Sequence, residues 1–237
     1  MKIAVISDIH GNLPALKAVM KDCEIKKVDQ IICLGDLVDF APWTNEVIEL
    51  IRTEKIITIM GNHDERVAFD LPIKEKPEKS QEEATARRLA IEITKRSILS
   101  ENKMFLKTLP RSLVLYFGNT SLYFTHASPR NIDEYLYENE DILQNECLRL
   151  AKTDFLILGH THLPYIKECE QGIIVNVGSV GKVKEAGKKA VYAIIEILQG
   201  CSPLVEIIRI DYPLDETATA IYNSQIPDFY AEQLLSS

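Results

Sequence analysis

The chain has 237 residues, of which 46% are hydrophobic and 26% charged, a composition typical of a globular protein with one substantial core. Its formal net charge of −8 argues against extended nucleic-acid binding, which needs clustered Lys and Arg, but not against a small nucleotide substrate. The five cysteines are odd in number and lack any Cys-x-x-Cys spacing, so the sequence suggests neither a disulfide framework nor a zinc knuckle.

The first segment is expected to form a strand, a loop and a helix. Residues 2–7 are a short, branched apolar run, too short for a signal peptide or a membrane span. We therefore expect a cytoplasmic protein without membrane contact. From Leu13 onward, apolar residues recur at helical spacing, with Asn12 placed to cap the helix and Pro14 in its first turn.

The same pattern then repeats along the chain. Residues 30–34 and 55–60 resemble buried strands, each ending in a glycine followed by polar residues, and residues 44–52 predict the helix between them. Three successive strands thus give way to polar loops at their carboxyl ends. This is the edge at which α/β sheets build ligand sites.

A polar, charged stretch at residues 65–108 interrupts the series. Within it, residues 82–99 predict an amphipathic helix and residues 74–79 a loop. We interpret this stretch as a helical insertion in a single domain that covers residues 1–237.

Strands return in the second half, with fewer helices between them. Gly118 and Asn119 predict a tight turn between the strands at residues 113–117 and 121–125. Further strands are expected at residues 154–158, 173–177, 191–198 and 204–210. This arrangement favours a mixed α/β sandwich over a doubly wound sheet, with a C-terminal helix after residue 214.

All five histidines lie at or just beyond the ends of expected strands, beside Asp, Asn or another His. The motifs are Asp8-Ile-His10, Gly35-Asp36-Leu-Val-Asp39, Gly61-Asn62-His63-Asp64, His126 and Gly159-His160-Thr-His162. Each motif alone has an ordinary interpretation as a cap, a turn or a structural histidine. Independent accidents would rarely produce the whole set.

These residue types can together bind two metal ions. Asp8 and His10 are two positions apart on an expected strand, so their side chains point to the same face and can bind one ion together. The two oxygens of Asp36 suffice to bridge ions about 3.5–4 Å apart. Oxygen and imidazole ligands without a nearby thiolate suit Mn²⁺, Fe, Zn²⁺, Ni²⁺ or Co²⁺. We expect two divalent cations of one or more of these elements.

The ordered series of motifs resembles the calcineurin-like metallophosphoesterases over roughly residues 1–180. Residues 7–16 and 32–38 are similar to small bacterial and archaeal members of the phosphodiesterase type. The resemblance implies a four-layer α-β-β-α sandwich of two mixed sheets flanked by helices.

The resemblance also implies roles for the individual residues. One metal ion would be held by Asp8, His10, Asp36 and His162, and the other by Asp36, Asn62, His126 and His160. His63 would act as the general acid and Asp39 would orient it. The implied reaction is attack of a metal-bound hydroxide on a small phosphate ester, with diesters favoured.

The chain also departs from its relatives. The related protein phosphatases have Arg-Gly where this chain has Phe40-Ala41, and Glu where it has Asp64, which weakens an assignment as a protein phosphatase. Ala127 and Val177 replace a usual Gly and Pro near the site. Arg130 either reaches a substrate phosphate or is a solvated loop residue.

Two alternatives to a phosphodiesterase remain open from the sequence. The first alternative is a phosphomonoesterase or protein phosphatase. The second is a non-catalytic metal-binding scaffold for a protein partner. The small retromer subunit has that last role within this superfamily, but it lacks the catalytic histidine, which is present here as His63.

Overall fold

A computed structural model describes residues 1–74, 80–198 and 200–236. The first sheet has the strand order β10 (Leu204–Ile210), β9 (Ala190–Glu196), β1 (Lys2–Ile6), β2 (Gln30–Cys33) and β3 (Ile57–Thr58). The second has the order β4 (Ser112–Phe117), β5 (Thr120–Thr125), β6 (Phe155–Leu158), β8 (Gly172–Asn176) and β7 (Tyr165–Cys169). The helices are α1 (Leu13–Ile25), α2 (Thr44–Thr53), α3 (Asn62–Ala68), α4 (Gln81–Ser97), α5 (Ser100–Thr108), α6 (Asp141–Ala151), α7 (Leu214–Tyr222) and α8 (Phe229–Leu235).

Both sheets are mixed, as expected. In the first, β1, β2 and β3 are parallel, and β9 pairs antiparallel with both β1 and β10. In the second, β5, β6 and β8 are parallel, and β4 and β7 are antiparallel edge strands. Strands β1 and β2 are thus a parallel pair, and so are β5 and β6. The loops that follow the carboxyl ends of these four strands lie at one edge of the sandwich, called the rim below.

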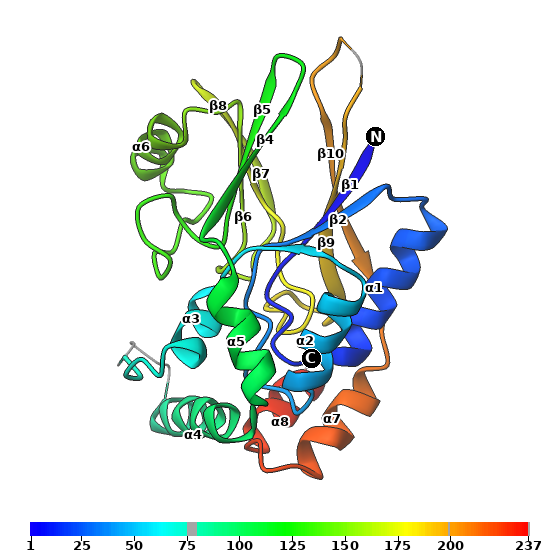
Figure 1. Ribbon diagram of the computed structural model, residues 1–237, viewed down its shortest axis with the longest axis vertical. Coiled ribbons are helices and arrows are strands. Elements are labelled where there is room, and N and C mark those ends of the chain that lie inside the picture. The colour runs from blue at the N-terminus through cyan, green and yellow to red at the C-terminus, as the bar shows by residue number, and fades with distance from the viewer. Residues whose placement is uncertain (75–79, 199, 237) are drawn as a thin grey trace.

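The two sheets pack face to face, with helices on their outer faces (Figure 1). Ile3 and Val5 of β1 point into the core between the sheets, where they pack with Phe124 of the second sheet. The alternate residues Ala4 and Ile6 lie on the outer face, in the cluster that includes α1 and α2. Helix α6 covers the outer face of the second sheet. The expected four-layer α-β-β-α sandwich is confirmed.

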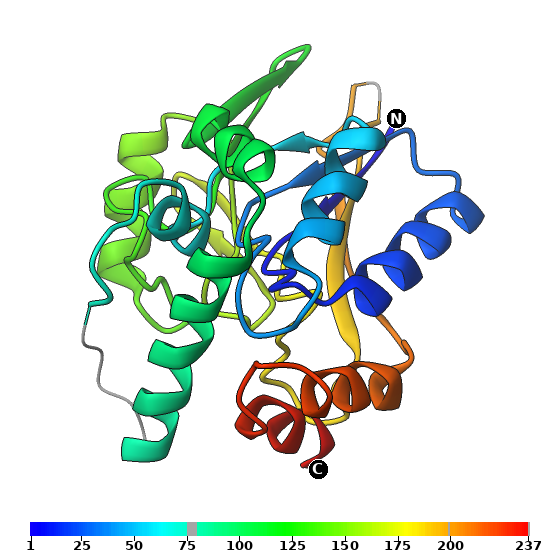
Figure 2. The same cartoon turned by 60° about the horizontal axis from the view of Figure 1, so that its bottom comes forward.

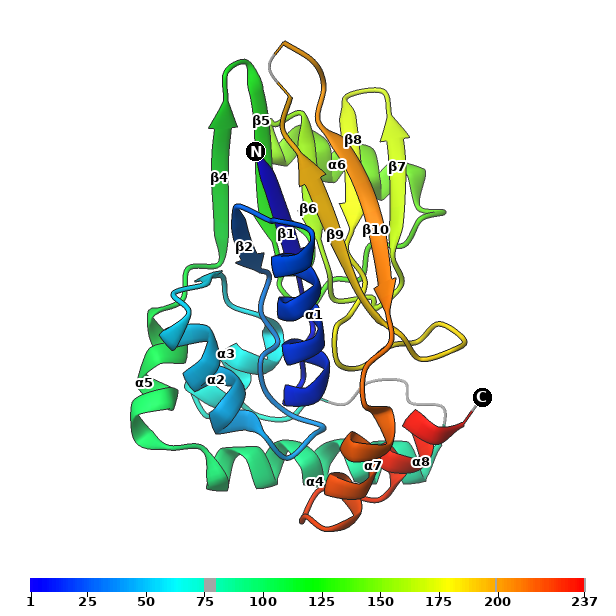
Figure 3. The same cartoon turned by 90° about the vertical axis from the view of Figure 1, so that its right-hand side faces the viewer.

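The remaining helices gather beyond one end of the strands (Figures 2 and 3). Helix α4 lies beside the C-terminal pair α7 and α8, and a small apolar cluster joins them. Its members include Ala86 and Ala90 of α4, Ile221 of α7 and Tyr230 of α8. Phe40, from the loop after β2, belongs to the same cluster. Helix α4 and the C-terminal helices therefore meet at the rim where that loop ends.

Several sequence predictions need correction. Strand β3 covers only Ile57–Thr58 of the expected residues 55–60. The residues after it, expected as a loop, begin helix α3 at Asn62, because Asp64 accepts a hydrogen bond from the backbone N–H of Gly61 and so caps the helix. The tail contains two helices, α7 and α8, where one was expected.

Helices α5 and α6 and strand β7 were not expected. Buried positions on α6 include the polar Gln144, whereas Ile142 is 80% exposed, so its hydrophobic pattern is obscured. Strand β7 is an edge strand with a largely exposed side-chain pattern. The turn at Gly118, with φ +60°, confirms the expected hairpin. Of the loop expected at residues 74–79, residues 75–79 lie outside the described residues.

Candidate metal centre

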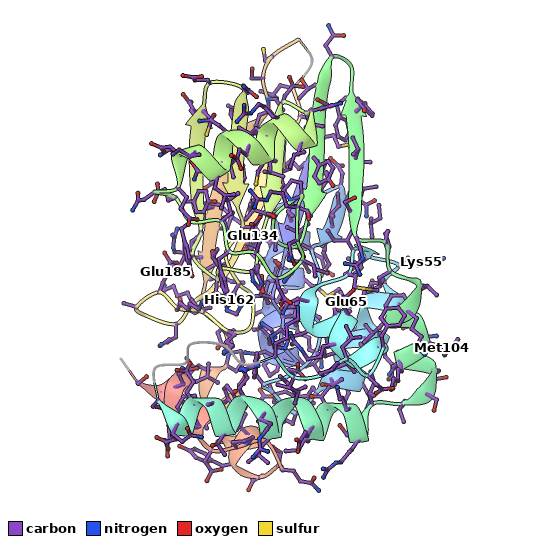
Figure 4. The ribbon with its side chains drawn as sticks, turned by 90° about the vertical axis from the view of Figure 1, so that its left-hand side faces the viewer. Lys55, Glu65, Met104, Glu134, His162 and Glu185 are labelled. Carbon is purple, nitrogen blue, oxygen red and sulfur yellow. The ribbon has the colours of Figure 1, made fainter. Side chains whose placement is uncertain are left out.

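The structure brings the seven expected ligands together at one buried site. They come from the loops after β1, β2, β5 and β6 and from the first residue of α3. Figure 4 places His162 near the middle of the molecule, between the strand ends and helix α4. All seven side chains are buried. Their donor atoms form two adjacent groups.

The first group consists of Asp8, His10 and His162. Nε2 of His162 lies 3.1 Å from Oδ1 of Asp8 and 3.3 Å from Nε2 of His10. Nε2 of His10 is 3.8 Å from the same Asp8 oxygen. One carboxylate and two imidazoles therefore point at a common position.

The second group consists of Asp36, His126 and His160, with Asn62 beside them. Nε2 of His126 lies 3.4 Å from Oδ2 of Asp36, 3.2 Å from Nδ1 of His160 and 3.0 Å from Oδ1 of Asn62. The amide oxygen of Asn62 thus joins the donor atoms of this group.

Asp36 connects the two groups. Its Oδ2 lies 3.7 Å from Nε2 of His10 in the first group and 3.4 Å from Nε2 of His126 in the second. Its Oδ1 accepts a 2.8 Å hydrogen bond from the backbone N–H of His63. One carboxylate thus faces both groups and is held in place from the start of α3.

Backbone carbonyl groups fix the orientation of three of the imidazoles. The Nδ1 atoms of His10, His126 and His162 lie 2.9, 3.0 and 2.5 Å from the carbonyl oxygens of Val38, Leu34 and Lys182. Because a carbonyl can only accept, each Nδ1 donates, and each ring presents its Nε2 lone pair to the site when it is neutral. Nε2 of His10 and Nε2 of His162 face each other across 3.3 Å. Two neutral rings repel each other in this contact, and a proton or a metal cation between them relieves the repulsion.

The backbone at the strand ends is locally strained. Five of the candidate ligands have positive φ, namely Asp8 (54°), His10 (51°), Asp36 (54°), His160 (64°) and His162 (61°). Residues other than glycine seldom adopt this region, and such strain clusters at functional sites. Backbone hydrogen bonds hold the turns, including Asp8 N–H to Gly35 O at 3.0 Å and His10 N–H to Asp36 O at 2.9 Å.

Two glycines permit a close approach of main chain to ligand. A Cβ atom on Gly61 would lie 2.2 Å from Oδ1 of Asp36. A Cβ atom on Gly159 would lie 2.2 Å from Oγ of Ser7 and 2.6 Å from Oδ2 of Asp8. Any side chain at either position would displace a candidate ligand, so these glycines are needed for packing.

His63 lies beside the donor atoms and forms a separate pair with Asp39. Its Nδ1 is 2.5 Å from Oδ2 of Asp39, and both side chains are buried. Burial raises the pKa of Asp39 to about 7. The rings of His63 and His10 are 5.1 Å apart, so the pair stands next to the first group.

The protonation of the candidate ligands reflects their burial and their mutual charges. Burial lowers the pKa of His10 to about 3 and also lowers the pKa of His162. Burial is the largest single effect on His126 and opposes its protonation, but the carboxylates of Asp36, Asp8 and Asp64 together outweigh burial and raise this pKa to about 9. In the metal-free protein, therefore, a proton on His126 offsets part of the carboxylate charge.

Sequence reasoning assigned no role to several residues around the site. The carboxylate of Asp64 accepts hydrogen bonds from the backbone N–H groups of Asp36, Leu37 and Gly61 at 2.8–3.0 Å. It thereby ties the end of β2 to the start of α3. In the sequence, the position of Asp64 in the Gly-Asn-His-Asp motif was the one signal that could have pointed to this role.

Two aromatic contacts had no sequence signal, because each joins distant segments. The ring of Tyr135 packs 4.3 Å from His160, and that of Phe40 packs 4.8 Å from His10.

Arg130 is ion-paired with Glu134 and Glu146 and its side chain is 42% exposed, which matches its interpretation as a surface residue.

The chain was compared with known proteins. A family profile described as the calcineurin-like phosphoesterase superfamily domain matches residues 1–200. An uncharacterized protein of Methanocaldococcus jannaschii is 31% identical over 251 residues, covering 98% of this chain and 96% of that protein. Among the described residues, no helix is both long and apolar enough to cross a membrane.

Two solved structures are similar over nearly the whole chain. A metallophosphoesterase from Sphaerobacter thermophilus has a TM-score of 0.78 and 26% identity, covering 99% of this chain and 98% of that one. A hypothetical protein from Pyrococcus horikoshii has a TM-score of 0.84 and 21% identity, covering 98% and 97%. The second similarity concerns the fold alone.

Proposed function

This chain belongs to the calcineurin-like phosphoesterase superfamily, and we propose that it is a metal-dependent hydrolase that cleaves phosphodiester bonds with two divalent cations. The supporting observation is the pair of donor groups joined by Asp36. The ligand atoms of the two groups come from carboxylate, amide and imidazole side chains, and such ligands suit Mn²⁺, Fe, Zn²⁺, Ni²⁺ or Co²⁺.

Each donor group would hold one cation. The first ion would be bound by Asp8, His10, Asp36 and His162, and the second by Asp36, Asn62, His126 and His160. The facing Nε2 atoms of His10 and His162 support this assignment, because a cation would turn their repulsion into ligation. When bound, the two cations would lower the pKa of an attacking water and neutralise charge on the phosphoryl oxygens.

His63 would serve as the general acid. When Asp39 is ionised it accepts a hydrogen bond from Nδ1 of His63, so the other ring nitrogen is left to protonate the leaving-group oxygen. The backbone N–H of His63 donates to Asp36, which fixes the acid relative to the carboxylate shared by both groups. This coupling keeps proton donor and phosphate in one geometry.

Diesters are favoured because the chain lacks the arginine that follows the equivalent of Asp39 in the related protein phosphatases. Phe40 and Ala41 follow Asp39, and Arg130 is ion-paired with two glutamates. A monoanionic diester needs less positive charge beyond that of the two cations. A phosphomonoesterase or protein phosphatase is the competing assignment.

The test is hydrolysis of bis(p-nitrophenyl) phosphate and p-nitrophenyl phosphate by protein reconstituted with Mn²⁺, after elemental analysis of its metals. We expect faster turnover of the diester, abolished by Asp36→Asn. If neither ester were hydrolysed by metal-loaded protein, or if Asp36→Asn were fully active, the proposal would fail, and a scaffold role would be preferred if a protein partner co-purified.

A further inference from the structure

Two tyrosines on the loop between β5 and α6 form a row of rings that begins at the metal centre. The ring of Tyr135 packs 4.3 Å from the ring of His160, a candidate ligand of the second donor group. The ring of Tyr137 lies parallel to that of Tyr135, with 5.6 Å between the ring centres and an angle of 4° between the planes. Tyr135 and Tyr137, called the tyrosine platform below, therefore extend the site beyond its ligands.

The two tyrosines differ in exposure. Tyr135 is half-buried, and the ammonium group of Lys184 lies 5.7 Å from the centre of its ring. Burial raises the pKa of the Tyr135 hydroxyl to about 12, with smaller effects of Tyr137 and of carboxylates from both donor groups. The side chain of Tyr137, in contrast, is 40% exposed. Tyr135 is thus the inner ring of the platform, and Tyr137 is the ring that a substrate can contact.

The backbone that carries the two rings is held in place on both sides. Leu136 is fully buried in the cluster between α6 and the second sheet, and its carbonyl accepts a 2.8 Å hydrogen bond from the hydroxyl of Tyr165. The carbonyl of Tyr137 accepts a 2.8 Å hydrogen bond from the side chain of Gln144, and its N–H donates to Glu140. The buried polar Gln144, which obscured the hydrophobic pattern of α6, therefore fixes the position of Tyr137.

The platform and the proposed general acid stand beside different donor groups. Tyr135 packs on His160 of the second group, whereas the ring of His63 is 5.1 Å from that of His10 in the first. The leaving alcohol of the ester departs toward His63, because that residue protonates its oxygen. The substituent that stays on phosphorus then has the platform as its neighbour.

We propose that Tyr137, backed by Tyr135, binds a flat aromatic group, an aryl ring or a nucleobase, on the substituent that stays on phosphorus. This rests on the proposed phosphodiesterase function and narrows its substrate class, since only a diester has such a substituent. Aromatic rings and bases stack on a tyrosine face more strongly than a saturated ring of the same size does. Tyr137 lies at the surface, so the group needs no enclosed pocket, and the fixed loop loses little conformational freedom when the group binds.

Diesters with one leaving group and different retained groups test the proposal on the metal-loaded protein. All of them release p-nitrophenol, so the chemistry at the leaving oxygen is the same. One pair retains 2-phenylethanol or 2-cyclohexylethanol, and the other retains thymidine, through its 5′ oxygen, or the abasic 1,2-dideoxyribose. We expect kcat/KM to be about fivefold higher for the phenyl member of the first pair, or about tenfold higher for the thymidine member of the second. The pair with the larger ratio distinguishes an aryl group from a nucleobase.

The variants locate the preference. Tyr137→Leu should reduce the ratio within each pair to about one, and Tyr137→Phe should retain it, because the aromatic face and not the hydroxyl makes the contact. Tyr116→Leu is the matched control, since Tyr116 is a tyrosine of β4 that is 73% exposed and lies next to the hairpin turn at Gly118. Its ratios should equal those of the parent protein. Metal content should be unchanged in all three variants.

A binding measurement separates this proposal from the proposed function. The phosphonates of 3-phenylpropane and 3-cyclohexylpropane have a methylene group in place of the ester oxygen and cannot be hydrolysed. Calorimetry should show about fivefold tighter binding of the phenyl compound to the metal-loaded parent protein, and equal binding of the two compounds to Tyr137→Leu.

The outcomes that overturn the two proposals are different. If the esters are hydrolysed without a preference in either pair, the platform is wrong and the proposed function stands. The platform is also wrong if Tyr137→Leu keeps the preference, even with lower rates on both members of a pair, since Tyr137 would then only shape the centre. If no ester is hydrolysed, the proposed function fails, and the phosphonate affinities alone decide whether the platform binds an aromatic group.

Discussion

A 2.5 Å hydrogen bond joins Oδ2 of Asp39 and Nδ1 of His63, and both side chains are buried beside the metal centre. The pair is held from two segments that are distant in sequence, the loop after β2 and the first turn of α3. Burial without a full counter-charge raises the pKa of Asp39 to about 7, which has a measurable consequence for stability.

Asp39 should make a contribution to the free energy of unfolding of the metal-free protein that falls as the pH rises from about 4 to 7. In this range Asp39 is protonated in the folded state but ionised in the unfolded state, so folding takes up a proton and is opposed by rising pH. The contribution of one such group is at most about 1.4 kcal/mol per pH unit. Urea unfolding at several pH values should give a slope of this free energy against pH that is more positive for Asp39→Asn than for the parent protein, because the lowered pKa values of His10 and His162 act in the opposite direction in both. Identical slopes would show that Asp39 is ionised in the folded protein throughout.

Replacement of His63 should slow turnover without loss of metal. His63→Gln removes the expected proton donor, and we expect kcat to fall by about 10²–10⁴-fold. His126→Gln removes a candidate ligand and should lower the metal content as well as kcat. Elemental analysis alongside kinetics separates the two effects. Metal loss in His63→Gln would identify His63 as a ligand instead.

Asp64 should be important for stability and for metal binding. Asp64→Ala leaves three backbone N–H groups, those of Asp36, Leu37 and Gly61, without their acceptor. Each buried donor left unsatisfied costs about 1–3 kcal/mol, so unfolding in urea should show a loss of about 3 kcal/mol or more. The control is Asp70→Asn, which removes an exposed pair with Lys103 but tolerates the φ of 52° at this position, and it should cost much less. Equal losses would contradict this role.

Gly159→Ala should disturb the metal centre directly. The added methyl group would lie 2.2 Å from Oγ of Ser7 and 2.6 Å from Oδ2 of Asp8, so a candidate ligand must move. We expect a loss of about 1–3 kcal/mol in stability and a reduced metal content. Gly187→Ala provides a comparison, because its φ of +81° causes strain but no atom lies within 4 Å of the added methyl. Its metal content should be unchanged, and full metal content in Gly159→Ala would contradict the expectation.

The sequence alone was sufficient for the elements with strong local signals. The apolar run of β1, the cap and spacing of α1 and the turn at Gly118 are encoded by neighbouring residues, and the structure confirms them. Strand β7 and helix α6 were missed because the place of each element in the fold, and not its local sequence, decides which of its side chains are exposed. An edge strand with exposed side chains and a helix with a buried Gln144 do not have a clear hydrophobic period.

Sequence and tertiary structure contributed differently to the site. The sequence determined which residues could bind metal, since five histidines beside Asp and Asn at strand ends are a matter of residue type and order. It could not determine that Asp36 faces both donor groups, or that Asp64, Phe40 and Lys182 support the centre. Contacts around the site join residues that are far apart in the chain, as His162 and Asp8 are, at 154 positions. They depend on how two sheets and their loops pack, because only packing brings such residues within a few ångströms of one another.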